Sequence, residues 1–241
     1  LGLGKMGGNM TARLIRNGIS VVGYDPNVSI IQELEKTEGM IPSTSVENAL
    51  SKLDDQKIVW MMLPAGDVTE KQIADLIPSL NKGDIIIDGG NSNYKHSIKM
   101  GKMLLEHDIG FMDCGTSGGV WGLDNGYCLM VGATKEVAKS VEPALRALAV
   151  TPRDGWLHVG PIGSGHFTKM IHNGIEYGMM ESFAEGLELL KGKTEFNIDI
   201  ANVTELWRHG SVVRSWLLDL MSEALQGDQN LENIEPYVAD S

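Results

Sequence analysis

The sequence predicts an α/β fold, in which a Rossmann-like doubly wound sheet is followed by an all-helical second domain. Through the first 160 residues, short apolar runs alternate with longer amphipathic stretches, the pattern of a mostly parallel sheet with connecting helices. A glycine-rich loop opens the chain, as expected for this class. From Gly163 onward the sequence changes to long helical stretches. We therefore expect a sheet domain over residues 1–163 and a helical domain over residues 164–241.

The elements follow in order. Helices of the first part are expected to end near Gly or Asn-Lys-Gly, which are common stop signals. The expected strands are ISVVGYD (19–25), KIVWMML (57–63), DIIIDGG (84–90), IGFMDCG (109–115) and YCLMVG (127–132). The expected helices are 9–18, 68–80, 92–108, 166–192, 200–210 and 211–225. Residues 227–241 are polar and rich in turn formers, which predicts a loop.

Composition excludes several classes of protein. The chain has 32 acidic and 20 basic residues, and its net charge of −12 repels a nucleic-acid backbone. Its two cysteines, Cys114 and Cys128, are too few for a disulfide framework and lack metal-ligand spacing, which suits the cytoplasm. No run approaches the ~18 apolar residues of a membrane span. We expect a cytoplasmic protein without a nucleic-acid partner, a membrane segment or a metal.

The opening loop has the motif G-x-G-x-x-G, formed by Gly2, Gly4 and Gly7, and the next residues can begin a helix whose N–H groups face a pyrophosphate. Asp25 ends a predicted strand about 20 residues later, where a carboxylate can accept from both ribose hydroxyls. A carboxylate there repels a 2′-phosphate, so we expect NAD, with NADP use left open. An ordinary glycine turn and an ordinary turn acid are the alternatives. The loop residues expected to contact the cofactor are Gly2, Leu3, Gly4, Lys5, Met6 and Gly7.

Three further loops follow successive predicted strands and are expected to line the same crevice, because ligands of such sheets bind outside the carboxyl ends of the strands. Small residues in each loop allow a ligand to approach the backbone. Each loop taken singly is also consistent with a plain turn. The three loops are Leu63–Gly66, with Leu63, Pro64 and Ala65 near the cofactor, Gly89–Tyr94, and Gly115–Gly119.

One stretch of the long helix, KMIHNGIEYG (169–178), places an acid–base set on one side. Its members, at i, i+3, i+4, i+7 and i+8, are Lys169, His172, Asn173, Glu176 and Tyr177. A solvated face is the alternative. Two glycines, Gly174 and Gly178, lie in the interior of the helix at a cost of up to ~1 kcal/mol each, which favours another element packed close by. In a pocket, a desolvated lysine can act as base and a glutamate as acid.

Four motifs together resemble one family. GLGKMGGNM, DGGNSNY, TSGGVWGL and KMIHNGIEYGMMES are similar to the decarboxylating 6-phosphogluconate dehydrogenases of the β-hydroxyacid dehydrogenase superfamily. GTSGGVWGLDNGYCLMVG and ELWRHGSVVRSWLLDL look like the short-chain, commonly NAD-linked branch. The resemblance extends along essentially the whole chain. It implies that residues 1–163 form the dinucleotide-binding domain and that residues 164–241 begin a helical substrate and dimerisation domain.

The resemblance also implies a reaction, in which 6-phosphogluconate is oxidised and decarboxylated to ribulose 5-phosphate and CO2 in the pentose phosphate pathway. Lys169 would take the hydroxyl proton and Glu176 would protonate the first carbon of the enediol. The residues implied at the substrate carboxylate and hydroxyls are Asn91, which also lies near the nicotinamide, Ser117, Gly118, Gly119, His172 and Asn173. Tyr177 and Arg214 are implied at the phosphate, where a guanidinium binds bidentately.

Two features depart from the family pattern. Only Leu1–Leu3 stands for the first strand, and the chain stops before the loop and helices that complete the family's helical domain, so we expect a longer protein. A homodimer or homotetramer is the expected assembly. Two other functions stay open: a dehydrogenase of another, unphosphorylated β-hydroxyacid, and a nucleotide-binding regulator without turnover.

Overall fold

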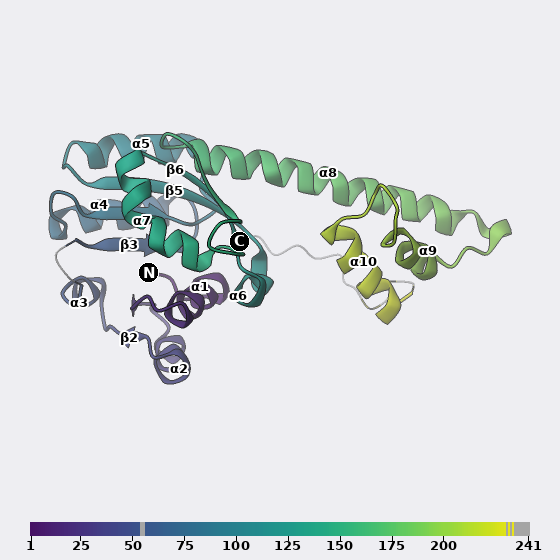
Figure 1. Ribbon diagram of the computed structural model, residues 1–241, viewed down its shortest axis with the longest axis horizontal. Helices are drawn as coiled ribbons and strands as arrows, with labels where there is room; N and C mark the ends of the chain where they lie inside the picture. Colours follow the sequence, from purple (N-terminus) through teal and green to yellow (C-terminus); the bar gives the residue numbers. More distant parts are fainter. Residues whose placement is uncertain (54–55, 230, 232, 234–241) are drawn as a thin grey trace. The chain divides into compact units, whose positions relative to one another are not determined.

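A computed structural model describes residues 1–53, 56–229, 231 and 233 (Figure 1). The chain divides into two compact units, Leu1–Met170 and Ile171–Ser241. Their boundary falls within α8 (Ser164–Gly192), which Figure 1 shows as one uninterrupted helix. The predicted fold class is confirmed: a Rossmann-like α/β part is followed by a helical part.

A five-stranded sheet forms the centre of the first unit, in the order β3-β4-β5-β6-β7. Its strands are β3 (Ile58–Met61), β4 (Ile85–Asp88), β5 (Gly110–Ser117), β6 (Cys128–Ala133) and β7 (Trp156–Gly160). All neighbouring pairs are parallel except β5 and β6. The connection between β5 and β6 holds only η2 (Gly119–Trp121) and α6 (Gly122–Asn125), which is too short for a crossover helix, so β6 returns antiparallel.

Helices cover both faces of this sheet, as a doubly wound fold requires. Side chains of β4 alternate between two cores, with Ile85 and Ile87 in one and Ile86 in the other. The first core packs against α1 (Lys5–Arg16) and α7 (Lys135–Leu148). The second packs against α3 (Val46–Leu50), α4 (Asp67–Leu76), which continues into η1 (Ile77–Ser79), and α5 (Tyr94–Leu105).

A separate two-stranded parallel sheet joins β1 (Val22–Gly23) to β2 (Ile41–Pro42), with α2 (Val28–Glu38) between them along the chain. The strand predicted over 19–25 is therefore much shorter, and only Val22 and Gly23 are paired, with Ile41 and Pro42. Leu1 pairs through its backbone with Trp60 and Met62 beside β3, and the Gly2 N–H donates to the Tyr24 carbonyl. The opening segment thus lies between β1 and β3. At this point the order of the strands switches, because β1 and β2 lie on one side of the segment and β3 to β7 lie on the other.

The second unit contains the remainder of α8, then η3 (Thr194–Phe196), α9 (Ile200–Trp207) and α10 (Trp216–Gly227). Leu187, Ala201 and Leu225 form its buried cluster. The helix predicted from residue 211 begins at Trp216 instead, because Ser215 caps it by accepting from the Leu218 N–H. The loop predicted over 227–241 lies mostly outside the described residues.

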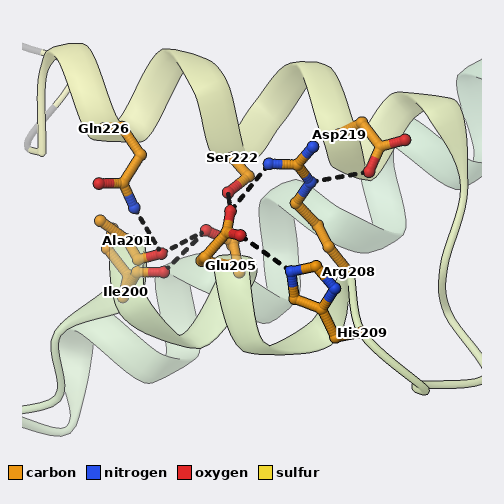
Figure 2. Close-up of polar contacts among 9 residues, drawn as sticks. Ile200, Ala201, Glu205, Arg208, His209, Asp219, Ser222 and Gln226 are labelled. Atoms are coloured by element: carbon orange, nitrogen blue, oxygen red, sulfur yellow. Dashed lines mark hydrogen bonds and ion pairs between the residues drawn. The ribbon is translucent and has the colours of Figure 1, made fainter.

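A polar network joins α9 to α10 around Glu205 (Figure 2). The Glu205 carboxylate accepts from His209 Nε2 at 3.0 Å, from Arg208 Nη1 at 2.8 Å and from Ser222 Oγ at 3.1 Å. Arg208 Nε also donates to Asp219 at 2.9 Å. These donors, with His209 the largest contributor, lower the pKa of Glu205 from its ordinary 4.5 to about 2.

Glu205→Gln is expected to destabilise the protein near neutral pH, with a difference from wild type that shrinks in acid. A carboxylate whose pKa is lowered by folding contributes stability above its unfolded pKa, and that contribution is lost as the pH falls from 4.5 towards about 2. Circular dichroism melts across this pH range measure the effect. Glu223→Gln, an exposed acid on α10, is the control. A Tm difference between Glu205→Gln and wild type that stays constant with pH would contradict the assignment.

Candidate functional site

The three glycines of the opening loop have three different surroundings. Gly2 has a φ of +81°, and a Cβ at this position would overlap the Met62 carbonyl oxygen. A Cβ at Gly7 would overlap the Gly2 carbonyl oxygen. Gly4, in contrast, is exposed, and apart from its chain neighbours no described atom lies within 4 Å of a Cβ position there. The first and third glycines therefore close the turn and pack it, whereas the second leaves an open backbone at the start of α1, where a pyrophosphate fits.

Asp25 holds the glycine loop to the end of β1. Its Oδ2 accepts from the Leu3 N–H at 2.7 Å, and its Oδ1 accepts from the Asn27 N–H at 2.8 Å. The carboxylate is partly exposed, so each oxygen retains a lone pair for a further donor. This arrangement suits a carboxylate that orders the loop and also accepts from ribose hydroxyls.

A cavity of about 370 Å³ adjoins Asp25. Val28 and Ile31 give it apolar surface, and Ser43 and Thr44, which follow β2, give it hydroxyls. The Lys52 ammonium also lies here and donates to the Pro42 carbonyl at 2.5 Å. The full lining is Tyr24, Asp25, Pro26, Val28, Ile31, Gln32, Glu35, Pro42, Ser43, Thr44 and Lys52. An apolar recess beside a partly exposed carboxylate has the size and chemistry for an adenosine, so the donor set and the open loop together fit a dinucleotide.

The loops predicted over Leu63–Gly66 and Gly89–Tyr94 follow the carboxyl ends of β3 and β4. The third predicted loop begins too early, because Gly115, Thr116 and Ser117 still belong to β5 and only Gly118 and Gly119 follow it. Leu63 is partly buried, whereas Pro64 and Ala65 are exposed before α4. Asn91 is exposed, and two residues later Asn93 caps α5 by accepting from the Lys95 N–H. Gly118 and Gly119, after Ser117, have φ values of +125° and +52°, conformations that glycine adopts most readily.

Lys169 lies directly against β5. Gly115 has no side chain, and a Cβ there would overlap the Lys169 Cβ. Two residues further along the same strand, Ser117 begins the turn through Gly118 and Gly119. The lysine side chain is partly buried. The first unit therefore brings a lysine together with the loop at the carboxyl end of β5.

The other four members of the predicted helical set belong to the second unit. His172 Nδ1 lies 3.2 Å from Asn173 Oδ1 and 3.6 Å from Glu176 Oε2, and both the His172 and Glu176 side chains are 36% exposed. Tyr177 is 65% exposed. His172, Asn173 and Glu176 thus form a contiguous polar cluster on α8, available to a small polar molecule.

Arg214 lies in the turn between α9 and α10 and borders a cavity of about 670 Å³. Gly178, Ser182 and Gly186 of α8 line the opposite side. Tyr177 is not among the lining residues, so the structure does not bring Tyr177 and Arg214 together there. The close packing predicted at Gly174 and Gly178 is not found either, because no described atom lies within 4 Å of a Cβ at those positions.

Among the residues that the structure describes, no cluster of three or more His, Cys, Asp or Glu side chains could hold a metal ion. Among the helices that the structure describes, none combines the length and apolarity needed to cross a membrane.

Sequence reasoning missed two groups near these sites. Ser43, Thr44 and Lys52 of the Asp25 cavity lie in a segment with no recognisable motif, and only the position of Ser43 after a strand could have indicated them. Asp113 of β5 and His166 of α8 are buried, and no motif marks them in the sequence.

Family models match most of the chain. Residues 1–160 match the model described as the NAD binding domain of 6-phosphogluconate dehydrogenase. Residues 165–195 match that of the 6-phosphogluconate dehydrogenase C-terminal domain.

Curated relatives and solved structures agree with these matches. A Bacillus subtilis (strain 168) protein named "Putative 6-phosphogluconate dehydrogenase YqeC" is 44% identical over 98% of this chain and 77% of its own length. A Haloferax volcanii protein named "6-phosphogluconate dehydrogenase, NAD(+)-dependent, decarboxylating" is 37% identical over 99% of this chain and 78% of its own. The solved Plasmodium falciparum 6-phosphogluconate dehydrogenase aligns with a TM-score of 0.85 at 28% identity, over 93% of this chain and 50% of that one.

Proposed function

The chain belongs to the 6-phosphogluconate dehydrogenase family, and on that premise we propose that the protein oxidises and decarboxylates 6-phosphogluconate to ribulose 5-phosphate and CO2 with NAD. The family makes it an oxidoreductase with an NAD(P)-binding domain. One observation carries the finer proposal. Lys169 packs on Gly115, beside the turn that follows β5, so a base candidate lies at the carboxyl end of the sheet where the cofactor loop also lies.

The residues that would hold NAD are Gly2–Gly7 at the pyrophosphate, Asp25 at the adenosine ribose, and Leu63, Pro64, Ala65 and Asn91 nearer the nicotinamide. When bound, NAD supplies the hydride acceptor. The Asp25 carboxylate would accept from both ribose hydroxyls and repel a 2′-phosphate, which is the support for NAD over NADP. The Lys52 ammonium at the same cavity donates to the Pro42 carbonyl, and its positive charge partly offsets this repulsion.

Lys169 is the proposed base. Its amine would accept the proton of the hydroxyl on the third carbon as that carbon is oxidised. The protonated ammonium would then donate to the new carbonyl oxygen, which stabilises the electron pair released when the first carbon departs as CO2. A lysine whose stem packs on β5 can serve both steps, because the proton it takes up first is the one it returns.

Glu176 is the proposed acid, and protonates the first carbon of the enediol. Its neighbour His172 would donate to a substrate oxygen, as would Asn173 and, from the first unit, Asn91 and Ser117. The backbone N–H groups of Gly118 and Gly119 would bind the carboxylate. Tyr177 and Arg214 would bind the phosphate, and the position of Arg214 at the border of a cavity supports its part in this role.

A steady-state assay of the full-length protein tests the proposal. We expect 6-phosphogluconate to reduce NAD, with one CO2 released from the first carbon for each NADH formed. If unphosphorylated β-hydroxyacids reduce the cofactor and 6-phosphogluconate does not, a sibling dehydrogenase is the correct function. If no substrate reduces NAD or NADP while the nucleotides still bind, the protein is a nucleotide-binding regulator.

Asp25→Ala is expected to raise kcat/KM for NADP relative to NAD by about 10-fold or more, because two ribose contacts and the repulsion of a 2′-phosphate are lost together. Initial rates with both cofactors measure the ratio. Glu33→Ala, an exposed acid of α2 that is not among the lining residues of this cavity, is the matched control for net charge. An unchanged ratio in Asp25→Ala would remove the role assigned to this carboxylate.

The proposal includes a cytoplasmic location and a homodimer or homotetramer. Val212, Trp216 and Leu206 of the second unit are 102%, 50% and 66% exposed, and exposed apolar side chains of this size are common where subunits meet. Sedimentation velocity of the purified protein tests the assembly.

A further inference from the structure

A buried carboxylate lies beneath the first turn of the helix that carries Lys169. Asp113, in the middle of β5, is fully buried. Its Oδ1 accepts from the Gly163 N–H at 2.6 Å and its Oδ2 accepts from the His166 N–H at 2.8 Å. The first N–H groups of a helix have no partner within the helix, and a carboxylate is their strongest acceptor. Both oxygens of one side chain thus determine where α8 begins.

Close backbone contacts leave this turn no room to shift. A Cβ at Gly165 would overlap the carbonyl oxygen of Asp113 and would lie 2.8 Å from the Gly132 nitrogen on β6. One turn later, Lys169 packs on Gly115. The helix therefore rests on the backbone of β5 and β6, and the distance along α8 from the Asp113 bonds to Lys169 is a single helical turn.

His166 links the same turn to a second loop. Its Nδ1 lies 2.7 Å from Ser97 Oγ, and both side chains are buried. Ser97 belongs to α5, which begins directly after the Asn91 loop. Within the described residues, no partner lies within hydrogen-bonding distance of the buried His166 Nε2. The bond between Nδ1 and Ser97 therefore orients the imidazole ring.

We propose that Asp113 is a positioning residue for Lys169, and that Ser97 assists it through His166. Asp113 holds the Gly163 and His166 N–H groups, and thereby fixes the height and rotation of α8 over β5. Lys169, one turn on, is then presented at a set distance from the Ser117–Gly119 turn. The expected effect on kcat rests on the proposed function, whereas the position that Asp113 gives to Lys169 does not depend on turnover.

Asp113→Asn tests the proposal because it preserves size and removes one of the two acceptors. The chain offers a matched control in Asp84, which is also buried and also accepts two backbone bonds, from Lys57 N–H at 2.9 Å and Asn81 N–H at 2.8 Å, at the amino end of β4. Asp84→Asn thus removes a carboxylate with two backbone donors at the opposite end of the strands, and with it the ion-pair partner of Lys57 Nζ at 3.8 Å. Both variants are compared by thermal melts, kinetics and the pH dependence of Lys169 carbamylation by cyanate, read by mass spectrometry.

We expect Asp113→Asn to lower kcat by about 10- to 100-fold with little change in KM for NAD, because a small displacement of a base is costly. The pH at which carbamylation of Lys169 reaches half its maximal rate should move as well. Asp84→Asn should leave kcat and this pH midpoint at wild-type values. If Asp113→Asn does not fold, Ser97→Ala is expected to lower kcat and move the midpoint in the same direction by less. Wild-type kcat and carbamylation in the folded variants, or an equal loss of kcat in Asp84→Asn, would overturn the proposal. If the wild type does not turn over 6-phosphogluconate, the proposed function fails, and the carbamylation midpoints alone decide whether Asp113 positions Lys169.

Discussion

Lys169→Met is expected to lower kcat by about 10²- to 10⁴-fold, the range for loss of a general acid–base group. Methionine keeps the aliphatic stem that packs on Gly115, so the helix position should persist while the amine is lost. NAD affinity should stay within a factor of about two, because the glycine loop and Asp25 are untouched. Single-turnover formation of NADH, with NAD binding measured by fluorescence, separates the chemical step from binding.

Lys191→Met is the control for this variant, since it removes the same group near the end of the same helix. It should turn over like the wild type. A Lys169→Met protein with wild-type kcat would show that another group takes the hydroxyl proton, even if 6-phosphogluconate proves to be the substrate.

Glu176→Gln is expected to lower kcat by about 10²- to 10³-fold and to change how the product is protonated. Glutamine keeps the shape and a hydrogen-bonding oxygen but has no proton to deliver to carbon. With the acid absent, the enediol would take its proton from water on either face. In deuterium oxide, the wild type should therefore yield ribulose 5-phosphate with deuterium at one of the two hydrogen positions of the first carbon. The variant should yield a mixture in which either position carries the deuterium. NMR of the product distinguishes the two results.

Glu185→Gln, an exposed acid further along α8, provides the comparison and should leave rate and stereochemistry unchanged. Stereospecific labelling retained in Glu176→Gln would assign the acid to another residue. His172, 3.6 Å from Glu176, would then be the first residue to test.

Most of the strands and helices followed from patterns local in the sequence, and the deviations have identifiable causes. The first helix begins at Lys5, earlier than predicted, because the glycine loop itself supplies its start at Gly4. The segment of α7 was not among the predicted helices, although it is long and amphipathic; it contains Pro143, which weakens a helical pattern. The strand β7 was missed because its side chains are only half buried and do not form an apolar run.

The sequence by itself determined those features that depend on residues close together along the chain. Glycine spacing and Asp25 indicated a dinucleotide loop, and the spacing of Lys169, His172, Asn173 and Glu176 placed them along one helix. Family membership followed from the same short motifs.

Only the tertiary structure decided what surrounds these residues. Asp113 bonds with N–H groups 50 and 53 residues away, and His166 meets Ser97 across 69 residues. Likewise, Gly115 looks like any other glycine until the path of α8 brings Lys169 against it. The physical reason is that hydrogen bonds to backbone groups and close approach to glycine depend on where the chain passes, and not on the residue types that a motif records.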